Sequence, residues 1–416
     1  MSSVDARGCT VSGASPRALE HFERALAEFQ LARGDSLAHL RSAIGEAPGF
    51  AMARVFEAYL CLGGRDPAGA AQAARSLGKI TMARLNSRER GHFAALAAAV
   101  AGEFEAASDL LGSLLREYPR DALALQVAHS FDYVRGDAHA LRNRVEAVLP
   151  AWSAEIPGYH AVLSMLAFGL EECGDYGRAE EAALHALQLD PRNVRAHHAI
   201  VHVLEMQGRA QDGVRWMSAR ERHWADEGPM ATHHWWHLAL FQLEAEGEQR
   251  ALETCDRHIG IGANAISDLI DASALLWRLH LRGMGLAGRW RVLAERWAPH
   301  AGDAYCAFSD LHAMMAFAGA ERWDLARALL AAQARRVLQR GSNSEMTHLV
   351  GLPACRALLA FGRGDYHAAE SLLSCLPPMA HRVGGSQVQR DVFELTRAAA
   401  SRALARPATR ATSLAA

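Results

Sequence analysis

The residues best suited to chemistry in this sequence gather in the pentapeptide HHWWH at positions 233–237. On a helix, His233 and His237 are one turn apart and point to one face, so two imidazoles could bind one metal ion. Glu244 is predicted to share that face. Histidine also transfers protons near neutral pH, so the same pair suits general acid–base catalysis.

A second histidine pair with the same spacing comes earlier, in the segment HHAIVHVLEM. His198, His202 and Glu205 stand at i, i+4 and i+7, again on one helical face. Neither segment contains HExxH, so the signature of a helical zinc protease is missing.

If the two helices are neighbours, their polar faces meet. We therefore predict one cavity shared by the catalytic candidates His198, His202, Glu205, His233 and His237, with the four histidines as metal candidates. A hydrogen-bonded network that only fixes helix packing is the alternative. Trp235 and Trp236 cannot both face the cavity, so one of them should pack against a neighbouring helix.

Further ionisable residues stand in the flanking segments. Asp268 and Asp271 join the catalytic candidates. The candidate ligand-binding residues are Glu171, Glu172, Trp236, Asp310, Arg390 and Asp391. Because Asp310 and His312 are two positions apart, at most one of them is expected to face inward. Buried charges must be paired, so Asp268 or Asp271 could instead form a structural ion pair with Arg278 or Arg390.

Glycine breaks predict the scaffold that positions these residues. Gly102, Gly136, Gly174 and Gly208 follow one another at steps of 34, 38 and 34 residues, the period of tetratricopeptide (TPR) helix pairs. One repeat cannot bury its apolar face alone. We therefore predict an all-α, TPR-like, right-handed superhelix of stacked antiparallel helix pairs.

The first helix of each pair is expected to line the concave surface. The expected ranges are 160–173, 194–207, 231–246, 268–282, 305–319, 347–362 and 386–400. The predicted organisation is a disordered tail (1–16), N-terminal repeats (17–150), C-terminal repeats that carry the polar cavity (151–402) and a disordered tail (403–416).

Several motifs together resemble the tetratricopeptide repeat protein 38 family: FGLEE, HHWWHLALF, LIDASALLWRL, GLPACRALL and GGSQVQRDVFEL. The likeness covers roughly residues 155–400. It implies a TPR-like fold but no particular reaction. The family's polar positions carry over to Glu171, Glu172, His198, His202, Glu205, His233, His237, Asp268, Asp271, Asp310, Arg390 and Asp391.

Composition excludes several functions. The net charge of -2 gives no reason to expect nucleic acid or a membrane surface as a partner. Seven widely spaced cysteines without a CxxC pair indicate free thiols and a cytoplasmic setting. The segment GMGLAG (283–288) matches GxGxxG but follows an expected helix, so no nucleotide cofactor is predicted. The cofactor is therefore either none or a divalent metal ion.

Two functions remain open. The first is a protein that binds a small molecule in the concave cavity and catalyses acid–base or metal-assisted chemistry on it. The second is a non-catalytic TPR scaffold that binds a peptide or protein partner in its groove. Peptide-binding repeats usually present Lys, Arg and Asn, whereas this groove carries His, Glu, Asp and Trp, so we favour the first function. The substrate and the oligomeric state stay open.

Overall fold

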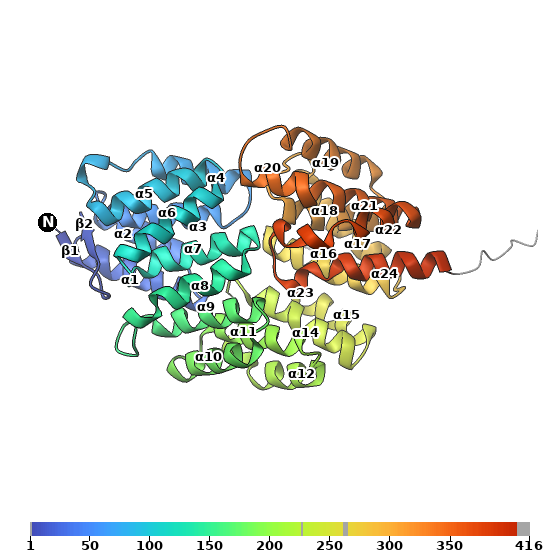
Figure 1. Ribbon diagram of the computed structural model, residues 1–416, viewed down its shortest axis with the longest axis horizontal. Helices are drawn as coiled ribbons and strands as arrows, with labels where there is room; N and C mark the ends of the chain where they lie inside the picture. Colours follow the sequence, from blue (N-terminus) through green and yellow to red (C-terminus); the bar gives the residue numbers. More distant parts are fainter. Residues whose placement is uncertain (1, 226–227, 261–264, 406–416) are drawn as a thin grey trace, which may run out of the picture.

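The computed structural model describes residues 2–225, 228–260 and 265–405, and it is almost entirely helical (Figure 1). Helices joined by short turns pack side by side, and each pair packs on the next, as α9 does on both α10 and α11. The all-α prediction is confirmed. No helix in the described ranges is long and apolar enough to cross a membrane.

The elements of the first third are β1 (Ser2–Val4), β2 (Thr10–Ser12), α1 (Pro16–Leu31), α2 (Ser36–Glu46), α3 (Ala51–Leu62), α4 (Pro67–Leu77), η1 (Met82–Arg84), α5 (Ser87–Val100), α6 (Phe104–Glu117), α7 (Ala122–Arg135), α8 (Ala138–Val148) and η2 (Leu149–Ala151). Those of the middle third are α9 (Tyr159–Glu172), α10 (Tyr176–Leu189), α11 (Val194–Met206), α12 (Ala210–Ala219), α13 (Glu221–Trp224), α14 (Ala231–Ala245), α15 (Glu248–His258) and α16 (Ile266–Leu281). The last third holds α17 (Ala287–Trp297), η3 (Ala298–His300), α18 (Ala307–Gly319), α19 (Trp323–Arg336), α20 (Ser342–Met346), the π-helical turn η4 (Thr347–Gly351), α21 (Leu352–Gly362), α22 (Tyr366–Ser374), η5 (Pro377–Val383), α23 (Gln387–Arg390) and α24 (Val392–Ala405).

Glycine ends the first helix of a pair, as the repeat spacing predicted. Gly174 and Gly208 have φ values of 81° and 67°, in the left-handed region that disfavours other residues. The next residue closes each turn: the Asp175 amide donates to the Leu170 carbonyl at 2.9 Å, and the Arg209 amide to that of Leu204 at 2.8 Å. This is the Schellman arrangement that caps a helix and reverses the chain.

Small residues let the helices approach closely. Ala179, Ala183 and Ala186 on α10 are fully buried. Larger apolar side chains fill the space between successive pairs, in one core centred on the first third and another that runs from α14 to α24.

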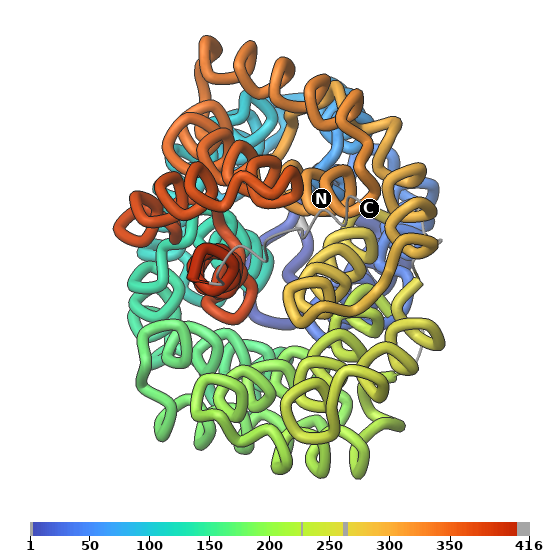
Figure 2. The backbone as a smooth tube through the Cα atoms, turned by 90° about the vertical axis from the view of Figure 1, so that its right-hand side faces the viewer, coloured from blue at the N-terminus to red at the C-terminus, as the bar shows by residue number. Residues whose placement is uncertain are grey.

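The helix pairs follow one another round a ring, so the first and last parts of the chain meet (Figure 2). The Ser342 amide donates to the Gly102 carbonyl at 2.9 Å, and the Tyr133 hydroxyl donates to Gln389 Oε1 at 2.7 Å. The last helix, α24, lies within the ring in Figure 2 and packs on α16, α21 and α22.

Residues 2–16 are ordered, which corrects the predicted disorder of residues 1–16 except for residue 1, which lies outside the described ranges. Strands β1 and β2 form an antiparallel hairpin. Val11 is fully buried, the Ser12 amide donates to Glu89 Oε1 at 2.7 Å, and Arg7 pairs with Glu23 at 2.7 Å. These contacts reach α5 and α1, so they are long-range and leave no trace in local composition. The predicted tail 403–416 begins inside α24, and its residues 406–416 lie outside the described ranges.

The helices that carry the predicted site begin and end close to the expected positions. The expected ranges 194–207 and 231–246 correspond to α11 and α14. GMGLAG follows α16 and runs into the first residues of α17, so a helix precedes it, as expected. The seven cysteines are all free.

Candidate metal centre and the adjoining cavity

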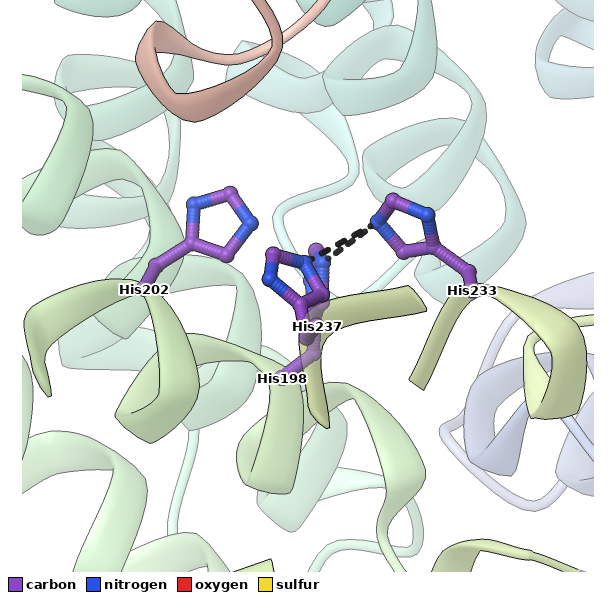
Figure 3. A group of neighbouring side chains, drawn as sticks. All are labelled: His198, His202, His233 and His237. Carbon is purple, nitrogen blue, oxygen red and sulfur yellow. Dashed lines mark hydrogen bonds between the residues drawn. The ribbon is translucent and has the colours of Figure 1, made fainter. Parts of the chain in front are cut away.

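Helices α11 and α14 each present two histidines to a common point (Figure 3). His233 Nε2 lies 3.1 Å from His198 Nε2 and 3.2 Å from His237 Nε2. His202 stands to one side of these three rings in Figure 3, and its ring centroid is 4.9 Å from that of His237. The two histidine pairs converge, as predicted, but only His198 and His233 line the adjoining cavity. The predicted single cavity shared also by His202, Glu205 and His237 is therefore wrong for these three residues.

In two of these rings, the Nδ1 atom on the side away from the common point contacts a carboxylate. Asp271 Oδ1 lies 2.9 Å from His233 Nδ1, and Glu205 Oε2 lies 3.1 Å from His237 Nδ1. When these carboxylates are ionised they only accept hydrogen bonds, so the Nδ1 atoms of His233 and His237 then carry the protons and their Nε2 atoms present lone pairs. Metal-binding histidines in proteins are oriented by the same contact.

In that state the Nε2 atoms of His233 and His237, 3.2 Å apart, face each other with their lone pairs, an arrangement that is repulsive unless a cation or a proton lies between them. Two nitrogens bound at about 2.0–2.1 Å to a tetrahedral zinc ion lie roughly 3.3 Å apart. The observed separations of 3.1 and 3.2 Å are close to that value. One nitrogen from each of the four histidines lies within 4.8 Å of the others, so the group could hold a metal ion.

Burial sets the charge state of this group. It lowers the pKa of His198 and of His237 well below the ordinary value, and neighbouring histidines add to the effect. These imidazoles are therefore neutral, as metal ligands must be. Burial also raises the pKa of Glu205 well above its ordinary value. A bound cation would act in the opposite direction and favour the ionised carboxylate.

His202 belongs to a second buried group together with Glu171. Its Nδ1 lies 3.2 Å from Glu171 Oε2, and its Nε2 has no hydrogen-bond partner among the described residues. Burial lowers the pKa of His202 to about 3 and raises that of Glu171 to about 8. Beside them, Glu172 accepts from the Gln387 amide at 3.0 Å and pairs with Arg390 at 3.3 Å.

A cavity of about 650 Å³ adjoins the histidine group. His198 and His233 line it, whereas His202 and His237 are fully buried behind them. Asp268 and Asp271 also reach the cavity. The opposite wall comes from the first third of the chain, with α3, α7 and the turn after α3.

Four predicted residues lie elsewhere. Glu244 is exposed and pairs with Arg282, because the face of α14 turns outward by its last turn. Asp310 is buried beside Gln333, whose Nε2 donates to it at 3.1 Å, and does not line the cavity. The remaining two, Arg390 and Asp391, form ion pairs with Glu172 and Arg278.

The alternative pairing of Asp268 or Asp271 with an arginine is not observed among the described residues, since Asp271 contacts His233 and Arg278 contacts Asp391. Glu171 and Glu172, two of the predicted ligand-binding residues, lie behind the cavity wall and do not line the cavity.

The two tryptophans of HHWWH point in different directions, as predicted. Trp235 stacks on His258 of α15 with ring centroids 3.6 Å apart. Trp236 is fully buried and stacks on His233 at 5.2 Å, so it supports the histidine and does not wall the cavity. His234 is buried, its Nδ1 lies 3.0 Å from the Met230 carbonyl oxygen, and its ring centroid lies 5.6 Å from that of His198.

Sequence reasoning missed the part of the cavity wall that carries positive charge. Arg195 and Arg65 both line the cavity. Arg195 stands three residues before His198, so it continues the stripe of His198, His202 and Glu205 along one face of α11. That spacing was a detectable signal, whereas nothing local marks Arg65.

Fold and site together define an all-helical protein of repeated helix pairs whose buried histidine group could hold a metal ion. No protein-family model matches the chain. The resemblance to the tetratricopeptide repeat protein 38 family therefore stays a prediction from motifs.

Proposed function

We propose that this protein is a metal-dependent enzyme that acts on a small molecule in the central cavity. In this proposal His198, His233 and His237 hold a divalent ion, and a TPR-like superhelix related to the tetratricopeptide repeat protein 38 family positions them. One observation carries the proposal: Nε2 atoms from two helices converge at 3.1 and 3.2 Å while carboxylates hold the Nδ1 atoms of His233 and His237.

Three protein ligands leave a coordination position open, which is typical of catalytic zinc sites. Because His198 and His233 reach the cavity, that position would face the substrate. An ion held there polarises a substrate oxygen, or lowers the pKa of a bound water until it becomes a nucleophile. Imidazole ligands without thiolates suit zinc, iron, nickel and copper.

The remaining histidine suits proton transfer. Glu171 holds His202 Nδ1, and the Nε2 atom has no partner in the part of the chain that the structure describes. Ionisation of Glu171 would raise the pKa of His202 from about 3, and the imidazole could then accept a proton beside the ion, as a general base does. We assign Asp271 and Glu205 to orienting the ligands.

Metal content tests the proposal. Wild-type protein is purified, and its zinc, iron, nickel and copper are quantified by mass spectrometry, beside H237Q and the control H367Q. His367 is exposed on α22, far from the group in sequence. We expect about one equivalent of one metal in wild type and H367Q, and none in H237Q. A metal-free wild-type protein that also takes up no added metal would refute the proposal and favour a scaffold for a peptide.

A further inference from the structure

We propose that the cavity takes a small molecule with an apolar body and an anionic group, and that Arg195 receives the anionic group. The inference rests on the proposed function for the placement of the reacting end, which would face His198 and His233. The anionic end is argued from Arg195 itself.

Arg195 is a half-buried cation without a counter-charge. It lines the cavity, and no carboxylate among the described residues pairs with it. Its Nη2 donates to the Phe29 carbonyl at a long 3.4 Å, and its Nε is buried without a partner in the described ranges. Burial lowers the pKa of Arg195 to about 10. A guanidinium in such a position destabilises the folded chain unless something else compensates it.

Other arginines with little exposed surface are paired with a carboxylate. Arg7 pairs with Glu23 at 2.7 Å, Arg88 with Asp121 at 2.7 Å and Arg144 with Asp132 at 2.6 Å. Arg195 departs from this pattern, and it does so where it faces a cavity. A charge kept unpaired beside a cavity is expected where a ligand brings the partner, because guanidinium binds carboxylate and phosphate with paired hydrogen bonds.

Arg65 adds a second cation to the same cavity. It lies on the turn between α3 and α4 with φ 55°, a backbone conformation unfavourable for a residue with a side chain. Its Cζ lies 5.7 Å from the Tyr133 ring and 5.8 Å from the Phe308 ring. The neighbouring Asp66 is already engaged as the N-cap of α4, where it accepts from the Gly69 amide at 2.8 Å.

The remaining wall defines the body of the ligand. It contains apolar and aromatic side chains: Phe29, Leu60, Val127, Phe131, Met165 and Phe168. Phe168 also stacks on His198 with ring centroids 5.7 Å apart, so the apolar wall reaches the histidine group. Along α11, Arg195 is one turn before His198, a rise of about 4.5 Å. The anionic group and the reacting atom are thus expected on the order of 5–10 Å apart, given the length of the arginine side chain.

Ligand binding tests the inference with two probes of matched shape, 3-phenylpropionate and its uncharged amide, 3-phenylpropionamide. Binding is measured by calorimetry to wild type, to R195M and to the control R192M, whose arginine is exposed and paired with Asp190. We expect wild type and R192M to prefer the acid at least tenfold. R195M should lose that preference and melt no lower than wild type, because it loses an uncompensated half-buried charge.

Phenyl phosphate tests whether the cavity prefers a phosphate or a carboxylate. The inference is supported if either phenyl phosphate or 3-phenylpropionate binds more tightly than the amide. Equal binding of acid and amide by wild type would overturn it, as would a preserved preference in R195M. An R195M protein that melts far below wild type would also overturn it, since the charge would then serve the fold. Acid preference is measured in H237Q as well. A preference kept there, with no metal in wild type, would refute only the proposed metal chemistry.

Discussion

Buried histidines contact carboxylates in two regions of this protein, yet their surroundings differ. In the first third, His92 Nε2 lies 2.8 Å from Asp121 Oδ2, which also accepts from Arg88 at 2.7 Å. The other Asp121 oxygen accepts from the Ala124 amide at 3.0 Å and caps α7. Every charge there meets its opposite, and the result is a polar network that fixes helix packing.

In the histidine group between α11 and α14, the carboxylates contact only the outer side of the rings. Glu205 and Asp271 hold the outer nitrogens, and the inner nitrogens of His198, His233 and His237 face one another. With both carboxylates ionised, these contacts leave the lone pairs of His233 and His237 directed at a centre shared with His198. The comparison teaches that the direction of the ring nitrogens, and not the presence of buried histidine beside carboxylate, distinguishes a candidate metal centre from a packing network.

Breaking the first network should have the largest effect on stability. D121A leaves Arg88 buried without its partner and removes the cap of α7, so we expect the free energy of unfolding to fall by about 3–5 kcal/mol. Urea unfolding measures the change. D324A, which removes an exposed ion pair with Arg322, serves as the control and should leave the free energy of unfolding close to that of wild type. Similar losses in the two variants would contradict this reading.

The same network predicts how stability responds to acid. Burial acts to raise the pKa of Asp121, but Arg88 and His92 outweigh it and hold the pKa well below its ordinary value. A carboxyl whose folded-state pKa is lowered stabilises the fold above its unfolded pKa, about 4, and loses that contribution as the pH falls further. Between pH 5 and 3 wild type should lose stability more steeply than D121N. Parallel curves would show that Asp121 is not the group responsible.

Added metal should stabilise the folded protein by binding the histidine group between α11 and α14, and this stabilisation should not depend on the Asp121 network. An ion that binds only the folded chain adds about 2.7 kcal/mol when its free concentration is 100 times the Kd. We expect the melting temperature of wild type to rise with added metal and to fall again with chelator. D121N should show the same response, whereas H237Q should show none. A metal response in H237Q equal to that of wild type would place the ion elsewhere.

Removing an orienting carboxylate should weaken metal binding without abolishing it. Changing a partner of this kind typically reduces affinity 10–100-fold. We expect E205Q and D271N to raise the metal Kd within that range, as measured by competition with a coloured chelator. E244Q is the matched control, because Glu244 stands on α14 but pairs with Arg282 at the surface. Unchanged affinity in both E205Q and D271N would remove the proposed role of these carboxylates.

His202 should show the smallest effect on the metal. If it serves as a base and not as a ligand, H202Q keeps the ion with an affinity within about threefold of wild type, a change below about 0.7 kcal/mol. The same chelator competition measures it. Loss of the metal in H202Q would make His202 a fourth ligand, and the site would then be closed, as structural zinc sites are.

Much of the scaffold and the centre of the site could be predicted from sequence, because helical periodicity is local. The spacing of His198, His202 and Glu205 places them on one face, and glycine breaks such as Gly174 mark where the chain turns. Both statements need only neighbouring residues.

What sequence could not supply depends on contacts between distant segments. The hairpin at residues 2–12 is held by Glu89 and Glu23, and the cavity is closed by residues of α3 and α7. Asp310 looked like a cavity residue by its helix, but the partner that decides its place, Gln333, comes from another one. Periodicity assigns a face to each helix and does not reveal which helix covers that face.

X-ray absorption at the edge of the bound metal tests the central claim most directly. The account predicts a first shell of nitrogen at about 2.0–2.1 Å, with the outer-shell scattering of at least three imidazole rings and no sulfur shell at about 2.3 Å. That spectrum should be lost in H237Q and kept in H367Q. A protein that binds no metal, or whose metal shows a first shell of sulfur or of oxygen without imidazole, would contradict the account.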